Sequence, residues 1–300
     1  MNENALVQEW TVRPERGSLP LVKFGVFVSL RLGRRVARTM LYPICLYFLL
    51  SSGRSARNSR DYLARVLDHR PGLREIFAHY LTFASCLLDR VFLLNEQNEE
   101  FEIWVHGEEI VRDIERRGGG CMLFGAHFGS FEVTRAVGRQ RTDLPISLLM
   151  YEENAKKIRA GLAAVNPRLA AEVIGLGRFD SLMAVADRLK RGHFIGVLAD
   201  RNVDGKDLLR YPFLGADAAF PRGPFRVAAL MRCPVVMMFG IYRGGRTYDV
   251  YFELLTDATE ARPQDADTWV SAMMQRYVAS LEQHCREAPF NWFNFFDFWA

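Results

Sequence analysis

The stretch that decides the fold is CMLFGAHFGSFE, residues 121–132. Its first five residues, 121–125, form a continuous apolar run, which is typical of a strand buried on both faces of a sheet. His127 stands two residues after this run, at the position where open α/β sheets place their ligands. Glu132 comes five residues later, in what we expect to be the first turn of a helix with Ser130 as its N-cap. The stretch therefore predicts a strand, a loop bearing a histidine, and a helix.

The segments around this stretch alternate between strand and helix patterns. Apolar or alternating runs predict further strands at 101–105, 146–151, 172–174, 194–199, 235–239 and 248–254. Helical spacing predicts helices at 55–67, 73–94, 108–117, 131–138, 155–164, 180–190 and 225–231. This alternation indicates the α/β class, with a mixed, mostly parallel sheet flanked by helices. We divide the chain into an N-terminal helical, membrane-associating region, residues 1–95, and an α/β domain, residues 96–300.

The composition excludes several classes of protein. Hydrophobic residues make up 49% of the 300 residues and charged residues 25%, so the chain can bury a large core and is not intrinsically disordered. A mean hydropathy of −0.05 excludes a polytopic membrane protein. The five cysteines and six histidines are scattered along the chain, without a C-x-x-C pair. We therefore expect no disulfide framework and no metal site, and the cysteine pattern fits a reducing compartment.

Positive charge is concentrated near the N-terminus, although the formal net charge of the chain is only +4. Residues 16–60 contain nine lysine or arginine residues and no aspartate or glutamate. One-sided charge of this kind indicates an anionic partner, such as a lipid surface, an acidic protein or a nucleic acid. We expect no nucleic-acid partner, because the aromatic residues here stand in apolar runs and no nucleic-acid-binding motif is present.

Within this basic region, residues 24–50 combine apolar and aromatic residues with arginines. The longest uncharged run, residues 39–53, has 15 residues, and Pro43 interrupts it. A helix that spans a bilayer needs about 20 apolar residues. The segment therefore predicts one or two helices lying in the membrane interface, with arginines reaching lipid phosphates and apolar side chains dipping inward. A core helix with a solvated basic face is the alternative.

His127 and Glu132 together suggest proton-transfer chemistry. Residues five apart on a continuous helix point about 140° away from each other, so the two side chains meet only if His127 lies in the loop before the helix. The carboxylate then accepts the imidazole N–H, and the other ring nitrogen is free to take a proton from a hydroxyl. Histidine suits this work because its ordinary pKa is about 6.5. A loop histidine with a purely structural hydrogen bond is the alternative.

At this point the sequence resembles a known family. H-x4-D/E after a buried strand, here within GAHFGSFE, is the signature of the lysophospholipid acyltransferase superfamily. The wider context is most similar to its bacterial lipid A acyltransferase branch, the late acyltransferases. The further segments that carry the resemblance are FIGVLAD at 194–200, YPFLG at 211–215, FPRGP at 220–224 and CPVV at 233–236. The likeness covers roughly residues 20–298.

The resemblance implies an α/β acyltransferase without cofactor or metal. Such an enzyme moves a fatty acyl group from an acyl thioester, on acyl carrier protein or coenzyme A, to a hydroxyl of a lipid or glycolipid. It implies His127 as the general base and Glu132 as its orienting carboxylate. Asp200 matches an acidic position with a structural or substrate-positioning role. An arginine between His127 and Asp200 is also expected, and the sequence leaves open whether this is Arg159 or Arg168.

Further substrate contacts are expected near the same motifs, from Gly129 and Ser130 beside the histidine and from Arg222 and Gly223 in FPRGP. Glycerol-phosphate-acylating relatives read F-P-E-G-T in this loop, whereas this chain has arginine at the third position and proline at the fifth. Recognition of a small glycerol phosphate is therefore not expected. The acceptor stays open among a lipid A precursor, a lysophospholipid, an ornithine lipid and a pigment lipid.

The resemblance also implies a location and leaves two other functions open. The branch carries an N-terminal transmembrane helix, whereas this chain has only the interrupted segment 24–50, so we expect a peripheral or interfacial protein on the cytoplasmic face of the bacterial inner membrane. The alternative functions are a thioesterase-like hydrolase with water as acceptor, and a non-catalytic lipid-binding protein on the same scaffold. The aromatic tail, residues 289–299, is expected either at the bilayer interface or acyl groove, or packed into the core.

Overall fold

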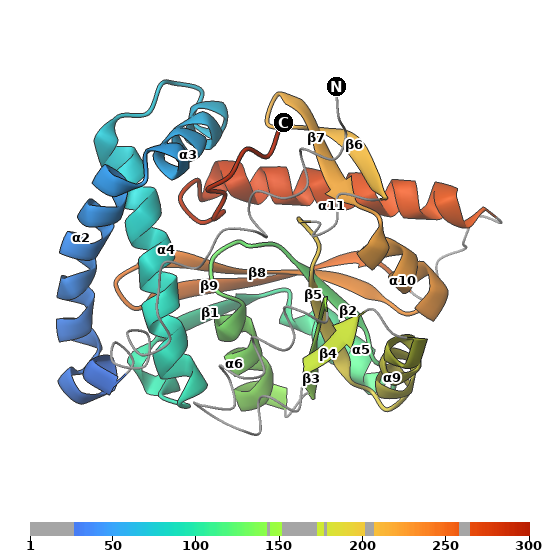
Figure 1. Cartoon of the computed structure of the whole chain (residues 1–300). Coiled ribbons are helices and arrows are strands. Elements are labelled where there is room, and N and C mark those ends of the chain that lie inside the picture. Colours follow the sequence, from blue (N-terminus) through green and yellow to red (C-terminus); the bar gives the residue numbers. More distant parts are fainter. Residues whose placement is uncertain (1–26, 143–144, 152–172, 177–178, 202–206, 258–264) are drawn as a thin grey trace.

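The computed structural model describes residues 27–142, 145–151, 173–176, 179–201, 207–257 and 265–300. Its centre is a seven-stranded sheet with the order β1-β9-β8-β2-β5-β3-β4 (Figure 1). These strands are β1 (Glu102–His106), β2 (Met122–Gly125), β3 (Ile146–Tyr151), β4 (Val173–Leu176), β5 (Phe194–Leu198), β8 (Val235–Gly244) and β9 (Thr247–Thr256). Strands β8, β2, β5, β3 and β4 run parallel, and β9 is antiparallel to β8. The predicted mixed, mostly parallel α/β sheet is confirmed.

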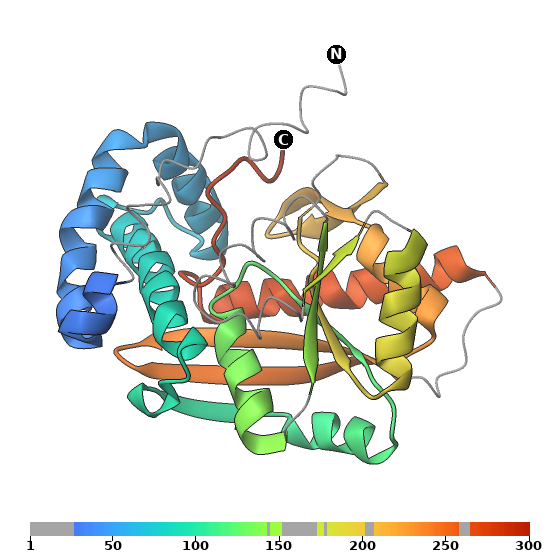
Figure 2. The same ribbon diagram turned by 60° about the horizontal axis from the view of Figure 1, so that its bottom comes forward.

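Helices cover both faces of this sheet, so its central strands β2, β5 and β8 are buried on two sides. Helices α5 (Glu108–Arg116) and α6 (Phe131–Thr142) cover one face, and α9 (Phe179–Lys190), α10 (Gly223–Met231) and α11 (Ala266–Glu287) cover the other (Figure 2). Strand β2 shows the consequence of this arrangement. Met122 and Phe124 enter the core on the α11 side, whereas Cys121 and Leu123 enter the core on the α6 side. The continuous apolar run of β2 is thus explained by burial on both faces.

Besides the short 3-10 helix Asn98–Glu100, a hairpin and a long helix were not predicted from the sequence. The first is a hairpin, β6 (Leu208–Phe213) paired with β7 (Ala216–Pro221). Its turn residues, Leu214 and Gly215, both have positive φ, of 51° and 81°. Two-residue hairpin turns usually have the sequence Asn-Gly or Asp-Gly. Here the first turn residue is leucine, so the sequence did not indicate a hairpin. The second is α11, which begins at a capping aspartate, Asp265, whose carboxylate accepts the amides of Asp267 and Thr268.

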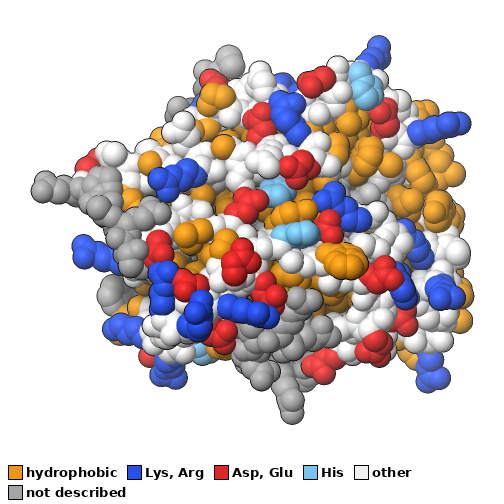
Figure 3. Space-filling model, turned by 180° about the vertical axis from the view of Figure 1, so that it is seen from behind, with side chains coloured by type: hydrophobic (Ala, Val, Ile, Leu, Met, Phe, Trp, Pro, Cys, Tyr) orange, Lys and Arg blue, Asp and Glu red, His pale blue; other side chains and the backbone are white. Residues whose placement is uncertain are grey.

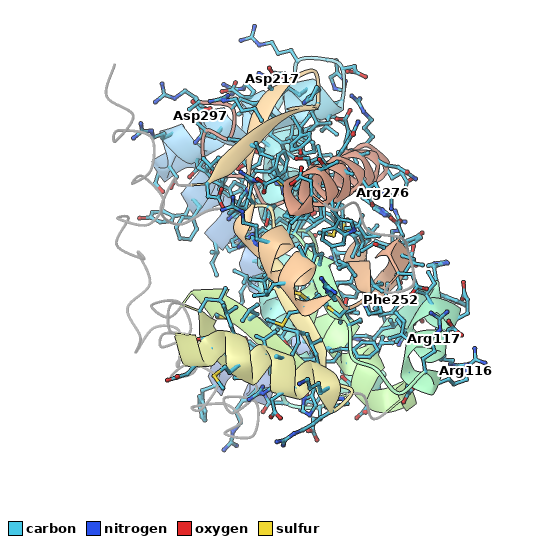
Figure 4. The ribbon with its side chains drawn as sticks, turned by 90° about the vertical axis from the view of Figure 1, so that its right-hand side faces the viewer. Arg116, Arg117, Asp217, Phe252, Arg276 and Asp297 are labelled. Carbon is cyan, nitrogen blue, oxygen red and sulfur yellow. The ribbon has the colours of Figure 1, made fainter. Side chains whose placement is uncertain are left out.

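Figure 4 views the molecule from the side. Asp217 on the β6–β7 hairpin and Asp297 in the C-terminal tail lie at the top of the view, and Arg116 and Arg117 at the end of α5 lie at its lower right. The tail and the hairpin therefore share the side of the sheet that α11 covers. The helix predicted at 155–164 lies outside the described residues.

The N-terminal part forms three helices, α2 (Arg34–Ser51), α3 (Gly53–Val66) and α4 (Leu73–Leu94). Helix α4 stands between α2 and the sheet (Figure 1), and side chains of α3 and α4 contribute to the hydrophobic cores of the α/β part. Residues 27–32 are also helical and are separated from α2 by Gly33, whose φ is +79°. The predicted pair of helices is therefore present. Pro43, expected to interrupt the segment, instead lies inside α2 on its exposed side.

A buried ion pair fixes α2 to the rest of the molecule. Arg34 donates to both carboxylate oxygens of Asp89 on α4, at 2.7 and 2.8 Å. The Tyr248 hydroxyl donates to the same carboxylate, and Arg34 and Arg38 both donate to the carbonyl of Gly245 in the β8–β9 turn. Arg34 is buried and therefore does not reach lipid phosphates as expected, whereas Arg38 is half-buried and that expectation stays a prediction for it. Their guanidinium groups have protein acceptors at hydrogen-bond distance, and the bidentate pair with Asp89 compensates the burial of Arg34.

Candidate active site

His127 lies in the loop between β2 and α6, and Asp200 lies directly after β5. Strands β2 and β5 are parallel neighbours in the sheet, so their carboxyl ends meet at the same edge. The backbone links the two loops at this edge, since the amide of Ala199 donates to the carbonyl of Gly125 at 3.0 Å. Two residues that are 73 positions apart in the chain thereby become neighbours. The site stands where open α/β sheets bind their ligands.

Asp200 holds His127 by two hydrogen bonds. Nδ1 of the imidazole is 2.8 Å from Asp200 Oδ1, and the backbone amide of His127 donates to Oδ2 at 3.1 Å. Asp200 is fully buried, whereas the side chain of His127 is 37% exposed. Because an ionised carboxylate can only accept, Nδ1 carries the proton in this pair. The other ring nitrogen, Nε2, then carries the lone pair and can accept a proton.

Glu132, the predicted partner of His127, has different contacts. It lies in the first turn of α6, as expected, and its side chain is buried. Its Oε1 is 3.1 Å from Arg90 Nη2 on α4, and its Oε2 is 3.4 Å from Arg135 Nε on α6. The carboxylate that contacts His127 in this structure is therefore Asp200 and not Glu132. The physical reason is that the Glu132 side chain lies between α6 and α4, where two guanidinium groups bind it.

Burial and neighbouring charges act in opposite directions on the pKa of Asp200 and on that of His127. Burial would raise the pKa of Asp200, but the charge and hydrogen bonds of His127 and the nearby Arg201 hold the pKa of this carboxyl well below its usual range. The imidazole of His127 is closely surrounded even though one edge is exposed. This desolvation, with the positive charge of Arg201, lowers the pKa of His127 below 6.5, while Asp200 acts in the opposite direction. Asp200 is thus ionised and His127 is neutral near pH 7.

The C-terminal segment closes around the histidine loop. The amide of Gly129 donates to the carbonyl of Asn291, and the amide of Phe293 donates to the carbonyl of His127, both at 2.8 Å. Trp292 between them donates its indole N–H to Asp200 Oδ2 at 3.1 Å. Asn291, Trp292, Phe293, Asn294 and Phe298 are buried. These residues are packed into the core, which was one of the two expectations for the tail. In this position they contact Asp200 and the loop that carries His127.

Gly129 and Ser130, expected to contact substrate, use their backbone groups within the fold. Gly129 has a φ of +57°, and a Cβ at this position would collide with the carbonyl oxygen of Gly240. The amide of Ser130 donates to that carbonyl at 2.8 Å, and the Ser130 side chain is buried. Both amides therefore have protein acceptors in this structure. Their contacts hold the loop against β8 and the C-terminal segment.

The other predicted substrate residues are placed elsewhere or are not described. Arg222 precedes α10 and pairs with Asp267 at the start of α11 and with Asp207. Gly223 is the first residue of α10. Within the described part of the chain, the ion-pair partners of Arg222 are these two aspartates and not His127. Arg159 and Arg168 lie outside the described residues.

Two site residues were missed in the sequence. Arg201 follows Asp200 directly, and its Nε lies 3.7 Å from Asp200 Oδ2 while Nη2 donates to the carbonyl of Phe293 at 2.6 Å. Trp292 lies in the aromatic tail, residues 289–299, for which the sequence predicted no particular contact. Arg201 could have been predicted as a site residue, because it is adjacent to Asp200 in the sequence. No local pattern links Trp292 to a residue 92 positions earlier.

Comparisons with known proteins identify the family of the chain. A search of curated proteins gave no match. The family model of the bacterial lipid A biosynthesis acyltransferases matches residues 20–300, which include β2, β5 and the C-terminal segment. This match confirms the predicted resemblance to the lipid A acyltransferase branch. The chain therefore belongs to the bacterial lipid A biosynthesis acyltransferase family and is an acyltransferase that acts on lipid.

Proposed function

We propose that this enzyme transfers a fatty acyl group from a thioester to a hydroxyl of a lipid or glycolipid, with His127 as the general base. The observation that supports this proposal is the hydrogen bond between His127 Nδ1 and Asp200 at the carboxyl edge of β2 and β5. Asp200 keeps the proton on Nδ1, so that Nε2 accepts the proton of the acceptor hydroxyl. Asp200 then stabilises the imidazolium that forms.

The proposed reaction balances without a metal or cofactor. The acceptor oxygen attacks the thioester carbonyl carbon as its proton moves to Nε2 of His127. The tetrahedral intermediate collapses, the C–S bond breaks, and the leaving thiolate takes the proton back from His127. The products are an oxygen ester on the lipid and the free thiol of the donor. A thioester is already activated, so the residues need mainly to deprotonate the acceptor and stabilise the oxyanion.

The donor is a thioester of acyl carrier protein or of coenzyme A, and charge supports the carrier protein. Acyl carrier protein is strongly acidic, and the basic N-terminal region would attract it. The side chains of Arg57 and Arg60 on α3 are exposed or partly exposed. Helix α3 lies against the tail that covers the site, because Asn58 donates to the carbonyl of Phe295 and Tyr62 donates to that of Pro289.

An assay with radiolabelled acyl carrier protein thioester or acyl-CoA tests this function. The purified enzyme is given a lipid A precursor, a lysophospholipid or an ornithine lipid in mixed micelles, and products are identified by mass spectrometry. We expect a new lipid ester with one donor and one class of acceptor. Release of free fatty acid with every acceptor would favour the thioesterase-like hydrolase. Thioester that is bound but not consumed would favour the non-catalytic lipid-binding protein.

We further propose that α2 holds the enzyme on the cytoplasmic face of the bacterial inner membrane. Five apolar side chains spaced three or four residues apart form one exposed face of this helix, which we call the α2 apolar stripe; each is 47–77% exposed: Val36, Met40, Ile44, Tyr47 and Leu50. Apolar side chains gather at the α2 edge of the molecule in Figure 3. A continuous exposed apolar surface of this kind is typical of a membrane or protein contact. Among the described helices, α4 is long and apolar enough to cross a membrane, but 44% of its most apolar window is buried inside the protein.

Glutamate substitutions in the α2 apolar stripe test this location. The triple variant Met40→Glu, Ile44→Glu and Tyr47→Glu should move most of the enzyme from anionic liposomes to the supernatant, because three charges would have to enter the interface. The matched control adds the same charge at three exposed apolar side chains outside α2: Trp104→Glu, Met183→Glu and Leu230→Glu. This control should stay bound. Equal flotation of both variants with liposomes would contradict the proposal. Arg34 is left unchanged, since its removal would leave Asp89 buried without its ion pair.

A further inference from the structure

The indole N–H of Trp292 provides one of the hydrogen bonds that hold Asp200. Trp292 Nε1 donates to Asp200 Oδ2 at 3.1 Å, and both residues are fully buried. The two oxygens of this carboxylate therefore have separate partners. Oδ1 faces His127 Nδ1, whereas Oδ2 accepts from Trp292 and from the backbone amide of His127. A donor on Oδ2 restricts rotation of the carboxylate and so fixes the direction in which Oδ1 points.

The indole is itself held rigidly. Its ring lies edge-on to the rings of Tyr62, Phe213 and Phe298, with centroid distances of 5.0, 5.2 and 4.8 Å. Its backbone carbonyl accepts a hydrogen bond from Nε2 of the buried His79 at 2.9 Å, and its backbone pairs with that of Phe128, the residue after His127. A ring packed on several sides cannot turn its N–H elsewhere without leaving the core.

We propose that Trp292 is a positioning residue for acyl transfer, because its indole N–H holds the Asp200 carboxylate in the orientation that keeps His127 ready to accept a proton. This inference rests on the proposed role of His127 as the base. Trp292 does not contact the reacting atoms, and it acts through Asp200. The C-terminal segment thus contributes to the chemistry of a histidine that stands 165 residues earlier in the chain.

The same interaction influences the proton affinity of His127. A carboxylate that receives a donor on Oδ2 carries less negative charge toward Oδ1, so it stabilises the imidazolium less strongly. The other groups that face the His127–Asp200 pair are Arg201 on the same loop and Tyr277 and Cys285 on α11. All three groups are retained in Trp292→Phe. Loss of the Trp292 donor should therefore raise the pKa of His127.

The chain offers a matched control in Trp299. Its Nε1 also donates at 3.1 Å, but the acceptor is the backbone carbonyl of Phe213. Trp299 lies in the same tail, with its ring centroid 6.2 Å from that of Trp292. The change of either tryptophan to phenylalanine removes the same atoms and one N–H donor. Only Trp292→Phe removes the donor from Asp200.

The experiment compares the Trp292→Phe and Trp299→Phe enzymes by steady-state kinetics and by NMR titration of His127. The His127 signals among the six histidines are assigned with His127→Gln. For Trp292→Phe we expect kcat to fall about tenfold or more with little change in KM, as is typical when a group that orients a functional side chain is lost. The pKa of His127 and the acid limb of the pH profile should both rise by about half a unit or more. Trp299→Phe should show neither change.

Two results would overturn the inference. One is a His127 pKa in Trp292→Phe that equals the value in Trp299→Phe. The other is a loss of kcat that merely follows a lower melting temperature, with the pH profile unmoved. If Trp292→Phe does not fold, benzothienylalanine at position 292 keeps the ring volume and replaces N–H by sulfur, and the same readouts apply. The NMR titration needs no substrate, so it tests whether Trp292 acts on His127 separately from the test of His127 as the base by His127→Ala.

Discussion

Changing His127 to alanine is expected to lower the rate of acyl transfer by about 10³-fold or more, because the acceptor hydroxyl loses the group that takes its proton. The measurement is lipid ester formed per enzyme at saturating thioester and acceptor. His106→Ala is the matched control, since His106 is a half-exposed histidine that stacks on Tyr251 at the end of β1, which β9 and β8 separate from β2. The control should keep its activity. A His127→Ala enzyme that forms the lipid ester at the wild-type rate would exclude His127 as the base.

The pH dependence of the wild-type enzyme follows from the same residue. His127 must be neutral to accept a proton, so activity falls as the pH drops through its pKa. Desolvation and Arg201 lower that pKa below the ordinary 6.5. The acid limb of kcat/KM is therefore expected below pH 6.5, with full activity of the base at neutral pH. A limb at or above pH 7 would show that a different group titrates.

The sequence predicted the position of His127 because the information is local. A continuous apolar run followed by Gly125-Ala126-His127 fits a strand buried on both faces, and the end of such a strand is where ligands bind. Most of the helices and strands were found for the same reason, since their hydrophobic spacing is written within ten or twenty residues. The hairpin turn at Leu214 and Gly215 was missed because leucine rarely takes positive φ.

The partners of His127 could not be predicted in this way. Asp200 reaches His127 only because β5 lies next to β2, and this neighbourhood depends on the strand order of the whole sheet. Glu132 was the nearest carboxylate in the sequence, but Arg90 arrives from α4 and, with Arg135, turns its side chain away. Similarly, the amphipathic pattern of residues 24–50 predicted helices without revealing that Arg34 would pair with Asp89.

Asp200→Asn is expected to lower acyl transfer by about 10²-fold or more at unchanged fold, as a base loses the carboxylate that fixes its tautomer. The asparagine side chain keeps the shape of Asp200 but carries no charge to stabilise the imidazolium. If its amide N–H₂ faces Nδ1, the ring proton is driven to Nε2, where it blocks the base. His127→Ala combined with Asp200→Asn should be little slower than His127→Ala alone, because the two residues act as a unit.

Glu132→Gln, made in the wild type and in His127→Ala, tests whether Glu132 or Asp200 orients His127. If Glu132 acts through His127, as the H-x4-E spacing predicts, its change should cost activity in the wild type and almost nothing in His127→Ala. If it acts through its ion pairs with Arg90 and Arg135, the change should lower the melting temperature and cost the same factor in both backgrounds. The contacts of the structure favour the second result. Full additivity of Asp200→Asn with His127→Ala, together with non-additivity of Glu132→Gln, would instead return the orienting role to Glu132.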